Sequence, residues 1–204
     1  MVKRFLDKAY SVDEQNQVRD LYDDWAASYD SEITENGYAT PTRCAEALRG
    51  LGPSPNLPVL DFGCGTGLSG IALRAAGFCV VDGIDISSEM IAIAMRKGCY
   101  RQLEIIDESK KFQVTPGDYA AICAAGVFGP GHAPAIMIAE LAASLGEGGI
   151  LVLSLNDETI KTGTFEEQIQ ILADSGTAQI VLREYGDHLP ARNIGSVVYA
   201  LQKK

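Results

Sequence analysis

The stretch at residues 58–67, PVLDFGCGTG, decides the fold of this 204-residue chain. The apolar residues at 59, 60 and 62 predict a buried strand, and the glycines at 63, 65 and 67 predict a turn where side chains would block a ligand or a tight bend. Apolar residues then follow at helical spacing from Leu68 to Ala75. Strand, glycine turn and helix come in the order that a nucleotide-binding unit requires.

A second predicted strand, FCVVDGID at residues 78–85, ends in an acid. The Asp85 carboxylate can accept hydrogen bonds from both hydroxyls of a ribose that lies across the strand ends. Gly65, Gly67 and Gly70 formally satisfy the dinucleotide fingerprint G-x-G-x-x-G. The expected strand end at Phe62 favours G-x-G-x-G instead, and Asp61 would repel a pyrophosphate but tolerate a cofactor with a positively charged amino-acid tail.

Four stretches of the chain resemble the class I S-adenosylmethionine (SAM) dependent methyltransferases, in particular the small stand-alone enzymes that act on small molecules. They are LDFGCGTG at 60–67, GIDIS at 83–87, SSEMIAIAMRKG at 87–98 and LGEGGILVLS at 145–154. The resemblance implies an α/β, Rossmann-like sheet of seven mostly parallel strands whose last strand is antiparallel. It also implies methyl transfer from SAM by in-line displacement, with S-adenosylhomocysteine (SAH) as the product, to a small-molecule acceptor that the sequence does not identify.

Length and composition fit one domain, because 204 residues with 47% hydrophobic content can bury a sizeable core. We expect a single methyltransferase domain over 1–204, with an N-terminal helical cap or lid at 1–52 and a Rossmann-like core at 57–204. The linker GPSPN at 52–56 separates the two. Five scattered cysteines without a C-x-x-C pair predict reduced thiols and no metal site.

The charge argues against nucleic acid as a partner. The formal net charge is −10, and the first 40 residues hold four Lys or Arg against nine Asp or Glu, so the expected cap would repel a polyanion. The basic start lacks an apolar run behind it, and the most apolar helical segment, 133–145, is too short to cross a bilayer. We therefore expect a soluble, cytoplasmic protein without membrane contact, and the sequence makes no prediction of its oligomeric state.

An amphipathic N-terminal helix is predicted from a capping box at Ser11 and Glu14. Within it, YDDWAASYD at 22–30 resembles the opening of many small methyltransferases, where such aromatics border the cofactor and acceptor pocket. Aromatic faces attract a sulfonium centre through their negative quadrupole. Simple packing of Tyr22, Trp25 and Tyr29 against the domain is the alternative.

Further cofactor contacts follow from the resemblance. Ser87 or Ser88 can cap the next helix, in which Met90 would pack against adenine; a plain core position is the alternative. After a strand near 103–106, Asp107 would accept a hydrogen bond from the adenine amino group and the Glu108 N–H would reach a ring nitrogen, unless these acids form only a solvated turn. The expected cofactor-binding residues are Tyr22, Trp25, Tyr29, Asp61, Gly63, Cys64, Gly65, Gly67, Asp85, Ile86, Met90, Asp107, Glu108 and Ala125.

The acceptor side is expected from the later strands. Strands near 119–125 and 150–155 lead to Phe128 and Asn156, which we expect at the substrate. The β-rich runs 179–185 and 196–201 are joined by a connection too short for a helix, so the final strand must return antiparallel.

This topology places both histidines, His132 and His188, at one mouth of the sheet. Either can act as a general base near neutral pH or be a plain loop residue. Arg192 can pair with an acidic acceptor, although the sequence favours a solvated arginine at this position.

Two other functions stay open on sequence grounds. A nicotinamide-dependent oxidoreductase would require a helical Tyr-x-x-x-Lys, and the match at Tyr199 and Lys203 falls on the last predicted strand. A non-catalytic SAM-binding module that regulates a partner would show the same cofactor motifs.

Overall fold

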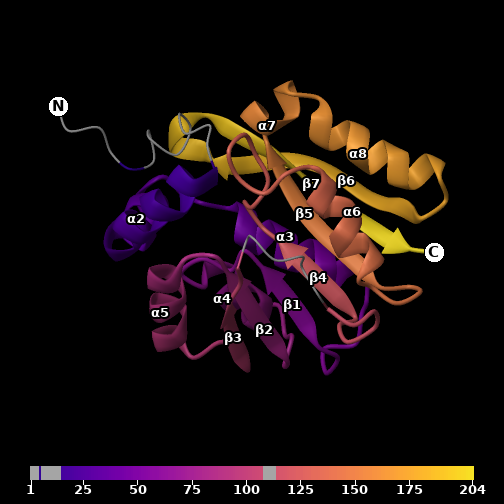
Figure 1. Ribbon diagram of the computed structural model, residues 1–204, viewed down its shortest axis with the longest axis horizontal. Coiled ribbons are helices and arrows are strands. Elements are labelled where there is room, and N and C mark those ends of the chain that lie inside the picture. Colours follow the sequence, from indigo (N-terminus) through magenta and orange to yellow (C-terminus); the bar gives the residue numbers. More distant parts are fainter. Residues whose placement is uncertain (1–4, 6–14, 108–113) are drawn as a thin grey trace.

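The structure is a computed structural model that describes residue 5 and the ranges 15–107 and 114–204 (Figure 1). Its centre is a seven-stranded sheet with the order β3-β2-β1-β4-β5-β7-β6. The strands are β1 Val59–Phe62, β2 Val81–Asp85, β3 Gln102–Ile105, β4 Ala121–Ala124, β5 Ile150–Asn156, β6 Ala178–Leu189 and β7 Ile194–Lys203. Neighbours from β3 to β5 pair in parallel, whereas β7 runs antiparallel to β5 and β6. The predicted Rossmann-like sheet with an antiparallel last strand is confirmed.

The central strands are short apolar runs that are covered on both faces. Every residue of β1 and β4 is buried, which is typical of parallel strands between two layers of helices. The strand order reverses between β1 and β4, because β2 and β3 lie on one side of β1 and β4 and β5 on the other. In open α/β sheets ligands bind at the carboxyl ends of the strands at such a switch point. The topology therefore places a binding site above the ends of β1 and β4.

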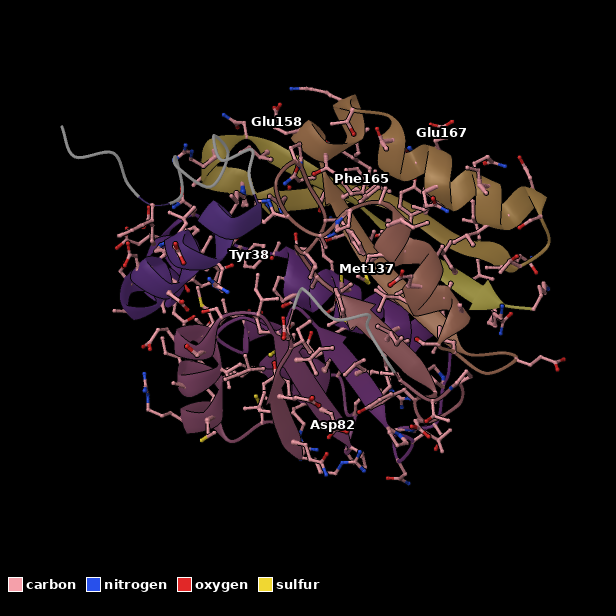
Figure 2. All side chains as sticks on the ribbon, in the orientation of Figure 1. Tyr38, Asp82, Met137, Glu158, Phe165 and Glu167 are labelled. Atoms are coloured by element: carbon pink, nitrogen blue, oxygen red, sulfur yellow. The ribbon has the colours of Figure 1, made fainter. Side chains whose placement is uncertain are left out.

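Helices cover both faces of the sheet. They are α2 Gln15–Glu35, α3 Thr40–Gly50, α4 Leu68–Ala75, α5 Ser88–Lys97, α6 Ile136–Ala143, α7 Asp157–Lys161 and α8 Thr164–Asp174, with a 3₁₀ turn, η1 Pro190–Arg192, between β6 and β7. On one face α3 and α4 pack Leu48 and Leu73 around Val59. On the other, α6 and α8 pack against the side of β1 that carries Leu60. Figure 2 shows Phe165 on the sheet side of α8 and Glu167 on its outer side.

Short-range signals set the helix ends where the sequence predicts them. The Ser87 hydroxyl accepts a hydrogen bond from the Met90 N–H at 3.1 Å and so caps α5, and Gly98 ends this helix in the left-handed conformation at φ 62°. The predicted capping box at Ser11 and Glu14 lies outside the described residues. No described helix has the length and apolar character needed to cross a membrane.

The N-terminal region differs from the expected cap at 1–52. The α3 residues Cys44, Ala45 and Leu48 are buried against the sheet, so this helix belongs to the core layer. Of the two helices described in this region, α2 lies above the carboxyl ends of the strands, where Trp25 packs with Leu189 of the β6–β7 hairpin in a small separate cluster (Figure 1). Among the described residues of the expected cap, α2 therefore covers the strand ends, whereas α3 is part of the core.

Candidate active site

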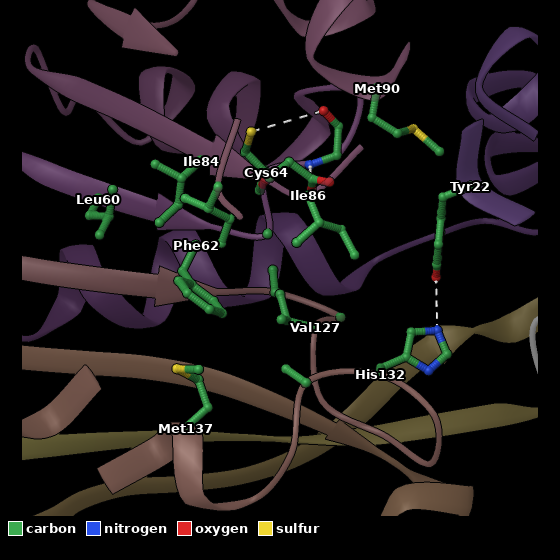
Figure 3. A pocket seen from close by; sticks show the side chains of 18 of the residues that line it. Tyr22, Leu60, Phe62, Cys64, Ile84, Ile86, Met90, Val127, His132 and Met137 are labelled. Carbon is green, nitrogen blue, oxygen red and sulfur yellow. Dashed lines mark hydrogen bonds between the residues drawn. The ribbon is translucent and has the colours of Figure 1, made fainter. Parts of the chain in front are cut away.

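A cavity of about 760 Å³ opens at the carboxyl ends of β1, β2, β3 and β4. The glycine loop, the end of β2, the start of α5 and the segment after β4 line it, and two tyrosines of α2 close it from above. Figure 3 shows Leu60, Phe62 and Ile84 pointing into it from the strands, with Met137 of α6 opposite them. The cavity lies at the strand-order reversal, where the topology predicts a ligand site.

The glycine loop needs its small residues for two different reasons. Gly63 has φ 68°, and a Cβ there would lie 2.6 Å from Val127 Cγ2, so a side chain would collide with the segment that leaves β4. Gly65 has φ 53°, and a Cβ there would meet no atom within 4 Å, so its backbone is open to the cavity. The loop thus offers bare backbone to a ligand, as a nucleotide-binding turn requires.

Asp85 ties this loop to the end of β2. Its Oδ2 accepts a hydrogen bond from the Gly65 N–H at 2.7 Å, and its Oδ1 accepts one from the Ser87 N–H at 2.9 Å. Burial raises the pKa of Asp85 above its ordinary value, and these hydrogen bonds oppose the rise because they favour the charged form. A carboxylate has about four acceptor positions, so two bonds leave room for the hydroxyls of a ribose.

Asp61 does not reach the cavity, which corrects the expected contact with the cofactor. Its side chain is fully buried beneath the loop, where Oδ2 accepts hydrogen bonds from Ser69 Oγ and Tyr100 Oη, both at 2.6 Å. Burial raises its pKa to about 6. Because side chains alternate along a strand, Leu60 and Phe62 face the cavity while Asp61 faces α4.

Most of the expected cofactor-binding residues come together around the larger cavity. Those that line it are Tyr22, Tyr29, Gly63, Cys64, Gly65, Asp85, Ile86, Met90, Asp107 and Ala125. Gly67 does not line it, because this residue precedes α4 in the left-handed conformation at φ 93°. Glu108 lies outside the described residues. Burial raises the pKa of the Cys64 thiol, which therefore stays protonated and contributes only a small side chain.

Two carboxylates of α2, which the sequence did not single out as contacts, fasten this helix over the loop. Asp23 Oδ1 accepts a short hydrogen bond from Ser87 Oγ, and Asp30 Oδ1 accepts one from Thr66 Oγ1 at 2.5 Å. Asp30 Oδ2 also pairs with Lys97 Nζ at 2.5 Å. The two acids lie seven residues apart, which places them on the same side of a helix, and this spacing is the signal that sequence reasoning could have used.

His132 is held as a neutral base at the cavity wall. Its Nδ1 lies 2.9 Å from the Pro130 carbonyl oxygen, which can only accept, so this nitrogen carries the proton. Nε2 is then the acceptor, and it accepts a hydrogen bond from the Tyr22 hydroxyl at 3.1 Å. Figure 3 shows this contact. Burial lowers the pKa of His132, which keeps the ring uncharged near neutral pH.

The remaining expected site residues surround a second, smaller cavity of about 100 Å³ beside the first. Trp25, Phe128, Asn156 and His188 line it and do not line the larger one. Asn156 also caps α7, because its Oδ1 accepts from the Thr159 N–H at 2.9 Å. The two histidines thus share one mouth, as the topology predicts, since His132 lines both cavities.

Two of these residues differ from their expected placement or chemistry. Arg192 lies in η1 and lines neither cavity, so the expected pairing with an acidic acceptor has no support from its position. His188 Nδ1 lies 2.7 Å from Thr40 Oγ1, and burial lowers the pKa of His188 to about 4. A ring with so low a pKa is a weak proton acceptor.

The described residues contain no cluster of three His, Cys, Asp or Glu side chains that could hold a metal ion. All five cysteines have free thiols.

Comparisons with known proteins agree on one family. Residues 37–194 match the family model of a methyltransferase domain. The chain is 30% identical over 149 residues to methyltransferase-like protein 27 of Homo sapiens, an alignment that covers 72% of this chain and 60% of the relative. The chain thus spans less than two thirds of the length of the curated relatives it matches.

Solved structures share the fold at low identity. Magnesium protoporphyrin IX methyltransferase from Synechocystis PCC 6803, crystallised with SAH, superposes with a TM-score of 0.71 at 20% identity, over 94% of this chain and 100% of that chain. A TehB-like SAM-dependent methyltransferase from Corynebacterium glutamicum superposes with a TM-score of 0.61 at 18% identity, over 90% and 98% of the two chains.

Proposed function

The chain belongs to the methyltransferase domain family, whose cofactor is SAM, and from this membership we propose that it transfers a methyl group from SAM to a small-molecule acceptor. Family membership sets aside the nicotinamide-dependent oxidoreductase. The non-catalytic regulatory module is distinguished by experiment below.

The observation that carries the proposal is the pairing of Asp85 with the open backbone of Gly65 at the head of the larger cavity. In this arrangement the loop would hold the amino-acid tail of SAM and Asp85 its ribose hydroxyls. Met90 and Asp107 line the same cavity and would hold the adenine. A volume of about 760 Å³ lies within the range of about 300–1,000 Å³ that is usual for ligand pockets, so the residues present fit a nucleoside with an amino-acid tail.

When bound, SAM supplies a methyl carbon on a positively charged sulfur; the lone pair of the acceptor forms the new bond to this carbon, and the electrons of the carbon–sulfur bond remain on sulfur. The rings of Tyr22 and Tyr29 line the cavity and would face that positive charge. Alignment of the reacting groups contributes roughly 7–11 kcal/mol in favourable cases, more than the factor of about 10² to 10⁴ from a general base. The walls that align the acceptor therefore matter more than proton removal.

His132 is the residue that we assign to proton removal. Its Nε2 is the unprotonated nitrogen, and it lies at the wall shared by the two cavities. Because the Tyr22 hydroxyl already donates to this nitrogen, in the proposed reaction the acceptor gives its proton to the Tyr22 oxygen while the Tyr22 hydroxyl proton passes to His132 Nε2 as the methyl group arrives. The pKa of His188, about 4, makes that ring the weaker candidate.

The test is a thermal-shift series with SAM, SAH, NAD and NADP, compared in the wild type, Asp85→Ala and the control Asp174→Ala, whose exposed carboxylate lies on α8. At a ligand concentration of about a hundred times the dissociation constant, SAM and SAH should stabilise the fold by roughly 2.7 kcal/mol. We expect Asp85→Ala to lose this effect and Asp174→Ala to keep it. Stabilisation by NAD alone, or by none of the four, contradicts the proposal. SAM binding without turnover across a broad acceptor panel would favour the regulatory module.

A further inference from the structure

The smaller cavity has walls of a distinct chemistry. Aromatic rings dominate it: Trp25 and Tyr29 meet edge to face with centroids 4.7 Å apart, and Tyr38 meets His188 in the same way at 5.3 Å. Figure 2 shows Tyr38 pointing inward between α2 and the sheet. The polar side chains on these walls are three tyrosines, two histidines, Asn156, Thr159 and Glu158, and burial keeps both imidazole rings neutral. Apart from the exposed Glu158 carboxylate, such a surface accepts and donates hydrogen bonds but supplies no fixed charge.

The smaller cavity shares a wall with the larger one. The residues that line both cavities are Tyr22, Tyr29, Tyr38, Gly126 and His132. A Cβ at Gly126 would lie 2.2 Å from the Tyr38 hydroxyl, so this glycine lets the phenol approach the backbone at the end of β4. A group that enters the smaller cavity would therefore lie beside His132, at the wall shared with the proposed cofactor site.

The cations near this cavity are directed elsewhere. Arg43 donates from NH1 to the carbonyl oxygens of Asp187 and Ser196, both at 3.0 Å, and from NH2 to that of Glu184 at 2.9 Å. Its guanidinium thus fastens the β6–β7 hairpin. None of the lining residues that the structure describes, in either cavity, is a lysine or arginine. The charged residue at the smaller cavity is Glu158, an exposed acid that pairs with Lys161 at 2.6 Å.

We propose that the smaller cavity binds the reacting end of the acceptor and selects a compact, non-anionic group that carries an N–H or O–H proton. This rests on the proposed function and adds the class of substrate to it. A volume of about 100 Å³ corresponds to roughly three water molecules at about 30 Å³ each, so a short chain end fits and a fused ring system does not. A carboxylate would be buried without a cation, which is costly, whereas an amine gains the aromatic faces and a neutral hydroxyl gains the phenols.

The single tryptophan of the chain is a specific reporter for this site. Trp25 lines the smaller cavity, is 1% exposed, and its indole N–H donates to Glu32 Oε2 at 2.9 Å, so its one indole resonance needs no assignment. The experiment titrates the ¹⁵N-labelled protein, with and without SAH, using the matched probes propylamine, propan-1-ol and propionate and the bulky probe 1-naphthylmethylamine.

We expect propylamine or propan-1-ol to shift the indole resonance saturably, and propionate to bind at least about tenfold more weakly. The substitution Phe128→Leu replaces a wall residue with a smaller one and so enlarges the cavity. In this variant the affinity for 1-naphthylmethylamine should rise at least about tenfold relative to the affinity for propylamine. Propionate binding as tightly as the other small probes overturns the proposal. So does equal binding of the bulky probe by the wild type, or the absence of any shift. Failure of SAH to bind, seen separately by thermal shift, would instead refute the proposed function.

Discussion

Replacement of Asp61 by asparagine should change the pH dependence of stability in a calculable way. Burial raises the pKa of this carboxyl from 3.8 to about 6. At about 1.36 kcal/mol per pKa unit, the difference corresponds to about 3 kcal/mol. A folded-state pKa above the unfolded value means that the group stabilises the fold below pH 3.8 and that this contribution is lost as the pH rises through 6. The amide of the introduced asparagine does not ionise, so the variant should escape that loss.

The measurement is urea unfolding of the wild type and Asp61→Asn at a series of pH values from about 3 to about 7, which covers both the unfolded and the folded pKa. Trp25 fluorescence and far-UV circular dichroism should report coincident transitions with a constant m-value. The unfolding free energy of the wild type minus that of the variant should fall by about 3 kcal/mol across this range. The control Asp174→Asn, an exposed acid on α8, should show no comparable fall.

Tyr100→Phe sharpens the same test. The Tyr100 hydroxyl donates to Asp61 Oδ2 at 2.6 Å and lowers the pKa of Asp61, in opposition to burial. Its removal should move the midpoint of the fall to higher pH. A difference curve that is flat, or that rises with pH, would refute the reasoning. It would show that the hydrogen bonds from Ser69 and Tyr100 stabilise the anion at least as much as burial destabilises it.

Three further outcomes follow from the site. His132→Gln should lower kcat by about 10² to 10⁴ while leaving the SAH dissociation constant unchanged; unchanged kcat would remove His132 from proton transfer. Gly63→Ala, whose Cβ would lie 2.6 Å from Val127 at a positive φ, should lower the unfolding free energy by about 1–3 kcal/mol and weaken SAH binding, and a native-like variant would contradict the close approach. Asp30→Asn should speed SAH dissociation by up to about fivefold in stopped flow, because a partly exposed ion pair with Lys97 contributes at most about 1 kcal/mol; dissociation as slow as in the wild type would show that this contact does not hold the lid.

Local patterns predicted the parts of the fold that depend on few neighbours. The apolar run of β1 and the glycines after it give a strand and a turn whatever surrounds them, and the short connection before β7 leaves an antiparallel return as the simple solution. The helix α7 was not predicted, because five residues are too few to show the periodic spacing of apolar residues that marks a helix. Its N-cap residue, Asn156, was expected at the substrate instead. The amphipathic face of α3 was visible in the sequence, but a pattern of this kind does not say which surface covers it.

In the candidate site, too, local sequence patterns predicted some features, whereas contacts between residues far apart in the sequence could not be predicted. Asp85 and Gly65 are 20 residues apart, and the sequence predicted both at the cofactor without predicting the hydrogen bond between them that the structure shows. Tyr22 and His132 are 110 residues apart, and Asp23 and Ser87 are 64 apart. No local pattern encodes such contacts, because they depend on where α2 crosses the sheet. The misplacement of Asp61 was avoidable, since strand alternation already sets it opposite Leu60 and Phe62.

The acidic character of α2 has a structural role that the net charge alone does not reveal. Asp23 lies at the start of α5, where its Oδ1 is within 3.4 Å of the Glu89 N–H as well as bonded to Ser87 Oγ, and Asp30 bonds to Thr66 just before α4. Helix N-termini carry partial positive charge and attract carboxylates. The acids that would repel a polyanion thus also dock the lid on the two helix ends that frame the cofactor loop. Because the same helix carries Tyr22 to His132, the contacts that dock α2 beside the glycine loop also position Tyr22 at the wall shared by the two cavities.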